Sequence, residues 1–111
     1  MKNLFLSIAL VLFASTSFAS ASSGPISEWY FMSNGVVLVY SSGVRTGTQP
    51  SCVTSPSNRF AFDATTPAGK AQLAGILAAY ASGKIVEIVG AGNCSAYSDS
   101  ESLSFFHVTD S

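Results

Sequence analysis

The side chains of this sequence that could carry out catalysis are few and scattered. His107 is the only imidazole, and its local sequence supplies no nucleophile beside it. Serine is abundant, but no Gly-x-Ser-x-Gly elbow is present to aim a hydroxyl at a substrate. Asp99 and Glu101 could act as paired carboxylates, although a spacing of two is common in solvated segments. We therefore assign no catalytic residue and do not expect an enzyme.

Metal and cofactor sites have little support either. Cys52, Cys94 and His107 are too few ligands for a tetrahedral zinc site. Gly90-Ala91-Gly92 resembles a phosphate-binding loop only superficially, because a cysteine and a serine-rich segment follow it instead of a helix. The formal net charge is −1 and only 10% of residues are charged. Such a surface cannot neutralise many phosphates, so nucleic-acid binding is not expected. No metal or cofactor is expected either, because the ligand set and the glycine loop support neither kind of site.

The first residues have the three-part pattern of a secretory signal. Lys2 precedes an apolar stretch over residues 4–14, and small polar residues follow it. That stretch is shorter than the roughly 20 residues of a membrane-spanning helix, so no membrane span is expected. Ala19-Ser20-Ala21 favours cleavage after Ala21, and Ser17-Phe18-Ala19 is the competing site.

A signal peptide over 1–21 leaves residues 22–111 as one small exported domain, secreted or periplasmic. A chain of this length has no room for a second core. Cys52 and Cys94 are then an even pair in an oxidising compartment, so we expect a disulfide between them. By the chain-entropy estimate this bridge contributes about 4 kcal/mol. Two buried free thiols are the alternative.

Local patterns predict five strands. They span residues 26–32, 36–40, 59–63, 84–89 and 103–108. Asn34-Gly35 predicts a tight hairpin between the first two strands, because this pair tolerates positive φ angles. The fourth strand is rich in branched apolar residues, which is typical of a strand covered on both faces.

One helix is predicted over residues 67–82. Thr65-Thr66-Pro67 supplies a capping hydroxyl and a first-turn proline, and Gly83 suits a left-handed C-terminal cap. The expected buried stripe consists of Leu73, Ile76, Leu77 and Tyr80. Alanines elsewhere on the helix keep its back smooth, which suits either contact with another subunit or a plain exposed surface.

Trp29, Tyr30, Phe31 and Tyr97 are the side chains best suited to bind a ligand. A flat ring covers the apolar face of a sugar while a hydroxyl or indole N–H keeps a polar contact. Core packing or a subunit interface is the alternative for Trp29 and Phe31. Tyr97 lies in a polar loop and is expected to be exposed. Trp29, Tyr30 and Tyr97 are the candidate ligand or interface residues.

From these elements alone we expect a small, mainly β, α+β fold or a partly open barrel. Several short segments, in this order, carry a family resemblance. They are Gly24 and Ile26, Asn34-Gly35-Val36, Pro50-Ser51-Cys52, Leu73, Leu77, Ala78 and Tyr80, Ser82-Gly83-Lys84-Ile85-Val86, Cys94 and Glu101. In this order the sequence resembles the small exported OB-fold proteins that include the B subunits of subtilase cytotoxin and related pertussis-like toxins.

The resemblance implies an OB-like five-stranded antiparallel barrel with one helix between strands three and four. It also implies a non-enzymatic ring oligomer, a pentamer, that binds sialylated or other glycans on host cells and could accompany an enzymatic toxin subunit. No stretch matches a toxin sugar pocket residue by residue, so no binding residues are carried over. The alternative function is a monomeric periplasmic protein that binds or inhibits another protein.

Overall fold

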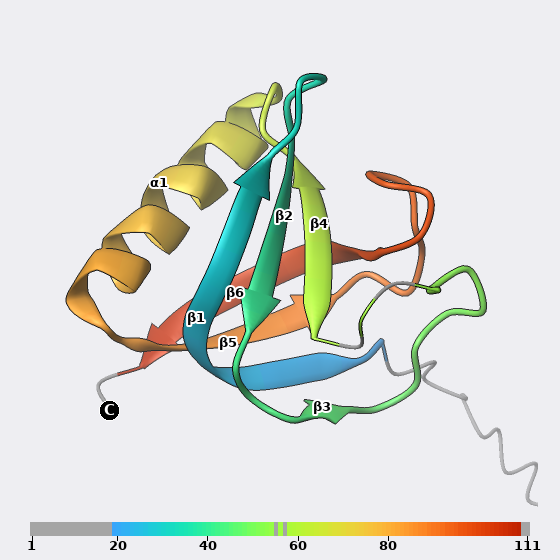
Figure 1. The fold of residues 1–111 in the computed structure, drawn as a ribbon, viewed down its shortest axis with the longest axis horizontal. Coiled ribbons are helices and arrows are strands. Elements are labelled where there is room, and N and C mark those ends of the chain that lie inside the picture. Colours follow the sequence, from blue (N-terminus) through green and yellow to red (C-terminus); the bar gives the residue numbers. More distant parts are fainter. Residues whose placement is uncertain (1–18, 55, 57, 110–111) are drawn as a thin grey trace, which may run out of the picture.

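A computed structural model describes residues 19–54, 56 and 58–109, and residues 1–18 of the expected leader lie outside this part. The described residues form a small, mainly β, α+β fold (Figure 1). Its elements are β1 (Ala21–Phe31), β2 (Val36–Ser41), β3 (Arg45–Thr46), β4 (Arg59–Asp63), α1 (Pro67–Ser82), β5 (Ile85–Gly90) and β6 (Glu101–Thr109). The five predicted strands and the helix are therefore present, and the short β3 is an additional strand.

Five of the strands close into a ring in the order β1, β2, β4, β6, β5 and back to β1. β1 serves both sides of this ring because it bends (Figure 1). Its first residues, Ala21 to Pro25, pair with β5, and its later residues pair with β2. A register shift between Ile26 and Glu28 marks the change from one partner to the other. β3 pairs with β1 outside the ring.

The pairing of β4 with β6 is parallel, which corrects the expectation of an all-antiparallel arrangement. It covers two positions, Phe60 opposite Glu101 and Ala61 opposite Ser102. Parallel neighbours require a long crossover connection, and here α1 and β5 lie between the two strands along the chain. The remaining pairings of the ring are antiparallel.

The predicted hairpin between β1 and β2 is confirmed. Gly35 has a φ of 87°, a conformation that side chains other than glycine rarely adopt. The Asn34 side chain accepts a hydrogen bond from the Val36 backbone N–H at 3.1 Å, which holds the turn. The first strand begins at Ala21 rather than at Ile26, because its N-terminal part finds a partner in β5.

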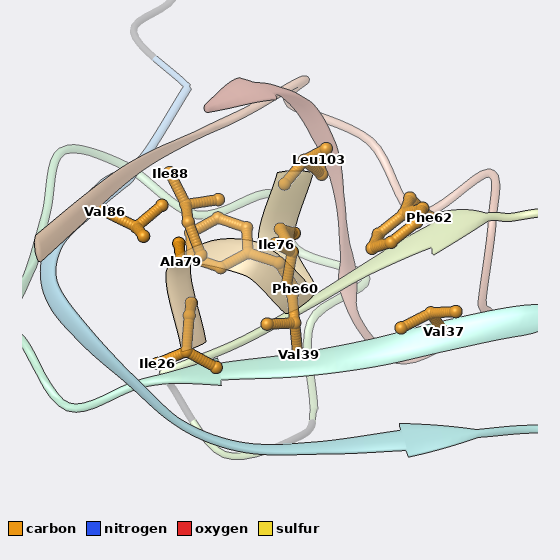
Figure 2. Close-up of a cluster of buried hydrophobic side chains, with 10 residues drawn as sticks. All are labelled: Ile26, Val37, Val39, Phe60, Phe62, Ile76, Ala79, Val86, Ile88 and Leu103. Atoms are coloured by element: carbon orange, nitrogen blue, oxygen red, sulfur yellow. The ribbon is translucent and has the colours of Figure 1, made fainter. Parts of the chain in front are cut away.

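The main core fills the ring beneath α1 (Figure 2). It contains Ile26, Val37, Val39, Phe60, Phe62, Ile76, Ala79, Val86, Ile88 and Leu103. Val36, Leu38 and Ala61 form a second cluster on the opposite face of β2 and β4. The strand covered on both faces is therefore β2, whereas β5 alternates buried and half-buried residues, contrary to the sequence expectation.

Helix α1 spans the predicted residues 67–82. The Thr66 hydroxyl accepts a hydrogen bond from the Gly69 backbone N–H at 2.9 Å, and Gly83 is left-handed with a φ of 66°. The buried face differs from the expected stripe. Gly69, Ile76 and Ala79 are buried, whereas Tyr80 is 47% exposed. The helix is thus rotated so that Tyr80 borders the core instead of filling it.

Candidate functional site

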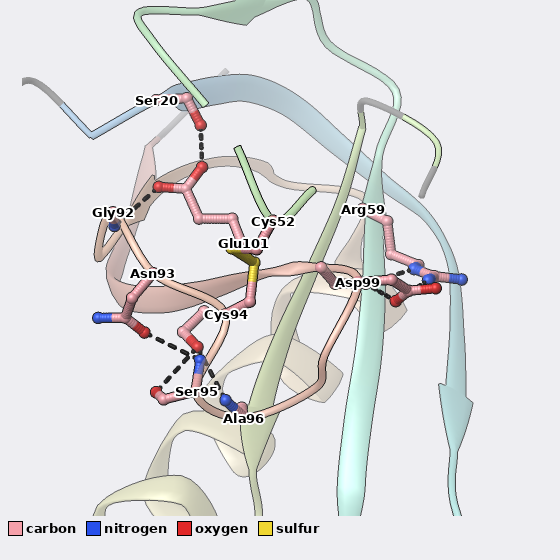
Figure 3. Close-up of a disulfide and its surroundings, with 12 residues drawn as sticks. Ser20, Cys52, Arg59, Gly92, Asn93, Cys94, Ser95, Ala96, Asp99 and Glu101 are labelled. Carbon is pink, nitrogen blue, oxygen red and sulfur yellow. Dashed lines mark hydrogen bonds and ion pairs between the residues drawn. A yellow bond between two sulfur atoms is a disulfide. The ribbon is translucent and has the colours of Figure 1, made fainter. Parts of the chain in front are cut away.

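The predicted disulfide between Cys52 and Cys94 is confirmed (Figure 3). Its Cα atoms are 6.2 Å apart, and it joins the loop before β4 to the loop over residues 91–100. The Thr54 backbone N–H donates to the Asp99 carbonyl at 3.1 Å and forms a second link between the same segments. These two links hold the 91–100 loop against the ring.

Glu101, the first residue of β6, has a fully buried side chain. Its Oε1 accepts hydrogen bonds from the Ser20 hydroxyl and from Arg45 Nη2, the latter at 3.2 Å. Its Oε2 accepts from the Gly92 backbone N–H at 2.9 Å (Figure 3). The Arg45 guanidinium lies 3.9 Å from the centroid of the Phe60 ring. This carboxylate is therefore compensated by charge and by hydrogen bonds.

Asp99 belongs to a different ion pair. Arg59 Nη2 lies 2.7 Å from Asp99 Oδ1, and Arg59 Nε donates to the Ser100 hydroxyl at 2.9 Å. Partial burial raises the pKa of Asp99, but hydrogen bonds from Ser100 and Arg59 outweigh it and hold that pKa below its usual value. Because Asp99 and Glu101 pair with different arginines, they do not form the two-carboxylate arrangement considered from their spacing.

His107 lies on an exposed part of β6. Its Nε2 is 2.8 Å from Oε1 of Glu87 on β5, the residue directly opposite in the strand register. The pair is a cross-strand contact between half-exposed side chains. Among the described residues no hydrogen bond connects His107 to a serine or cysteine, so the structure assembles no nucleophile and base there.

The three candidate aromatic residues do not converge on one site. Trp29 is half-buried against the core, with its ring centroid 4.3 Å from Phe31 and 6.2 Å from Tyr80. Tyr30 is 46% exposed and contacts Tyr40 edge to face at 5.7 Å. Successive residues of a strand point to opposite faces, so Trp29 and Tyr30 serve different surfaces.

Tyr97 is half-buried rather than exposed, which corrects the sequence expectation. It packs against the cluster of Val36, Leu38 and Ala61 on the outer face of β2 and β4. The Arg59 guanidinium lies 5.9 Å from its ring centroid. A polar loop sequence did not indicate this burial, because the apolar surface that Tyr97 covers comes from strands distant in the chain.

A pocket of about 310 Å³ opens where β4 and β6 separate. The strands pair only as far as Ala61 and Ser102, and beyond this point Phe62 and Leu103 line the gap between them. The first turns of α1 form one wall, and Ser95 with its neighbour in the loop that the disulfide anchors forms another. A concave, partly polar space on a rigid frame is the usual form of a small-molecule site.

Two side chains of this pocket have hydrogen-bonding capacity left over. The half-buried Gln72 amide has no hydrogen-bond partner in the described part of the chain. Hydrogen bonds from the Thr65 hydroxyl and backbone N–H to Asp63 Oδ1 lower the Asp63 pKa, so the carboxylate is ionised at neutral pH. Asp63 Oδ2 likewise has no partner within the described ranges.

The remaining polar groups of the pocket are already held in place. The Ser95 and Ser102 hydroxyl oxygens are 3.2 Å apart, and Ser102 Oγ accepts from the Ala96 backbone N–H at 3.0 Å. The Ser95 backbone N–H donates to the Asn93 side chain at 3.0 Å. These groups are therefore already hydrogen-bonded within the protein, whereas the Gln72 amide and Asp63 Oδ2 are available to a ligand.

Sequence reasoning missed both pocket residues. Gln72 lies three residues after Gly69 and four before Ile76, and this spacing places it on the inward side of α1. The stripe expected from the sequence consists of Leu73, Ile76, Leu77 and Tyr80 and does not include Gln72. A polar residue in register with Ile76 was the available signal.

The described residues contain no group of three or more side chains suited to hold a metal ion. In the same part of the chain, no helix has the length and hydrophobicity needed to cross a membrane. Comparison with known families, curated proteins and solved structures gives no significant match to this chain. The candidate site therefore has to be interpreted from its own geometry and chemistry.

Proposed function

We propose that this chain is an exported, non-enzymatic carbohydrate-binding module built on an OB-like barrel. The ring of five strands supports this assignment, as does the position of α1 between the third and fourth strands of that ring along the chain. The disulfide supports export, because such bonds persist in oxidising compartments. The leader pattern of residues 1–21 agrees with the same destination.

The observation that carries the binding function is the pocket with two unused polar side chains. The same pocket holds an amide that both donates and accepts and an ionised carboxylate that accepts, and these groups suit the hydroxyl groups of a sugar ring. Ala68, which is exposed on the first turn of α1, supplies apolar surface for the carbon face of the ring. Because Asp63 repels a second carboxylate, the preferred ligand is a neutral sugar rather than a sialylated one.

A binding experiment on the purified exported protein tests this function. Isothermal titration with neutral monosaccharides, guided by a glycan array, should detect binding that Gln72→Ala weakens by a factor of roughly 2–10, the value of one hydrogen bond. Alanine favours the helix, so this substitution should leave the fold intact. Gln49→Ala is the matched control, since Gln49 lies in the loop before β4 and does not line the pocket.

Absence of glycan binding, or equal affinity of the Gln72→Ala variant and its parent, contradicts the proposed pocket. The alternative function, a monomeric periplasmic protein that binds another protein, would then become the better explanation. Exposed rings at Phe31 and Phe105 offer contact surface for such a partner. Tyr97→Ala is a weaker probe of sugar binding than Gln72→Ala, because Tyr97 packs on the second cluster.

We also propose that the module acts as a ring oligomer with five copies. The exposed side of α1 carries small side chains that let a second subunit approach closely. They are Ala71, Ala74, Ala78 and Ala81. Several binding sites on one ring would raise the avidity for a multivalent glycan surface without any new contact at each site.

A further inference from the structure

The folded domain includes residues that the sequence assigns to the leader. Ser20 is fully buried, although the favoured cleavage site places it in the discarded peptide. Its hydroxyl donates to the buried carboxylate of Glu101 and accepts from Arg45 Nε at 2.7 Å. Its carbonyl accepts from the Gly90 backbone N–H at 2.8 Å. Ser20 is therefore part of the polar centre of the fold.

Ala21 is also part of the structure. It is the first residue of β1 and pairs with Val89 of β5 on one side and with Thr46 of β3 on the other. A cut after Ala21 would remove both pairings at the edge where β3 joins the ring. It would also leave the buried backbone N–H of Gly90 without its acceptor.

We propose that the leader is removed after Ala19, so that the mature chain begins at Ser20. In this reaction water adds across the Ala19–Ser20 peptide bond, which gives a carboxylate on Ala19 and an ammonium group on Ser20. Ser17 and Ala19 place small side chains at the two positions that a signal peptidase inspects, as Ala19 and Ala21 do for the other site. The contacts of Ser20 and Ala21 therefore favour the competing site over the cut after Ala21 that the leader pattern prefers.

The environment of Glu101 supplies a second reason for this site. A chain that begins at Ser20 keeps the hydroxyl that donates to the buried carboxylate of Glu101. Arg45 faces that carboxylate as well. A chain that begins at Ser22 lacks the Ser20 hydroxyl, and Glu101 then depends on Arg45 and Gly92.

The inference rests on the proposed export, and intact mass of the protein secreted by a bacterial host from the full chain tests it. A first residue of Ser20 is the expected result, and a first residue of Ser22 overturns the proposal. A chain that still begins with Met1 overturns export and this cleavage together. A Ser20 start combined with no glycan binding supports the cleavage site and contradicts only the pocket.

Two leader variants test the physical reason for the choice. Ser17→Phe places a bulky residue at the upstream site and should move the cut to Ala21, whereas Ala21→Gln should leave the Ser20 start unchanged. The mature protein that this Ser17→Phe variant gives, which begins at Ser22, should have a melting temperature at least about 4 °C below that of the parent. Ser20→Ala, which keeps a small residue after the cut, should also lower the melting temperature. Melting temperatures equal to that of the parent in both proteins would contradict a structural role for Ser20.

Discussion

The carboxylate of Glu101 lies fully buried, where an isolated charge is strongly unfavourable. Three groups from distant parts of the chain meet it: Ser20, Arg45 and the backbone N–H of Gly92. A side chain at position 90 would collide with the carboxylate of Glu101, which glycine avoids. The pairing of β5 with β6 thus places Gly90 against the buried charge of Glu101.

Removing the positive partner of this pair should be much more damaging than removing a surface pair. Arg45→Met leaves Glu101 with neutral donors alone and should lower the free energy of unfolding by about 3–5 kcal/mol. The double variant Arg45→Met with Glu101→Leu should recover most of that loss, because no buried charge remains. Urea denaturation measures both.

Glu87→Gln is the matched control for this prediction. It alters the exposed pair with His107 and should change stability by no more than about 0.5 kcal/mol. If Arg45→Met were as mild as Glu87→Gln, the pair with Glu101 would contribute little, and the buried network would not organise this end of the fold.

The chemistry of single residues could be predicted from the sequence only in part. Two cysteines that follow a leader pattern predict a bridge without knowledge of the fold. The partnership of Glu101 with Arg45 could not be predicted, because it depends on which strands meet when the ring closes. For the same reason, Asp99 and Glu101 looked like a pair in the sequence and are separated by their arginines in the structure.

At the scale of elements, the helix and the antiparallel strands follow from local signals. The Thr66 cap and Gly83 define both ends of α1, and Asn34-Gly35 defines the hairpin. β3 has two residues and no pattern of its own, so only its pairing with β1 identifies it. The parallel pairing of β4 and β6 escapes local reasoning as well, and the pocket depends on that pairing.

The buried face of α1 can be tested by two truncations. Ile76→Ala removes a side chain that is 1% exposed in the main core and should lower stability by about 2–5 kcal/mol. Tyr80→Ala removes an exposed ring that touches the edge of Trp29 and should lower it by about 0.5–1.5 kcal/mol. Thermal denaturation compares the stability of the two variants. A larger loss of stability for Tyr80→Ala would favour the buried helix face expected from the sequence.

The disulfide couples two loops that no strand pairing joins directly, so its loss should affect stability and the pocket together. Cys52→Ser should lower the free energy of unfolding by about 2–5 kcal/mol. It should also weaken sugar binding, because the loop that carries Ser95 loses its anchor. A reductant should reproduce both effects in the parent and should change nothing further in the variant. If the stability and sugar binding of the parent do not change once its disulfide is fully reduced, the role given to this bridge is wrong.

At the scale of the whole molecule, exposed apolar surface lies on more than one side. Phe31 is 55% exposed beside Trp29, Tyr80 is 47% exposed on α1, and Phe105 is 53% exposed on β6. In the proposed oligomer, neighbouring subunits would cover part of this surface. Copies of the same chain are the partner that the ring proposal supplies, with α1 as the approach surface.

The proposed oligomer of five chains predicts the mass of the protein in solution. Light scattering at micromolar concentration should report about five times the mass of one mature chain, as the proposed pentamer requires. Ala74→Arg places a long charged side chain on the exposed alanine surface of α1 and should shift the protein to single chains. Its stability should change by no more than about 0.5 kcal/mol, because Ala74 is exposed within a chain. Thr48→Arg, in an exposed loop away from α1, is the matched control and should leave the mass unchanged. A parent protein that stays monomeric at every accessible concentration would contradict the ring and favour a monomeric protein-binding role.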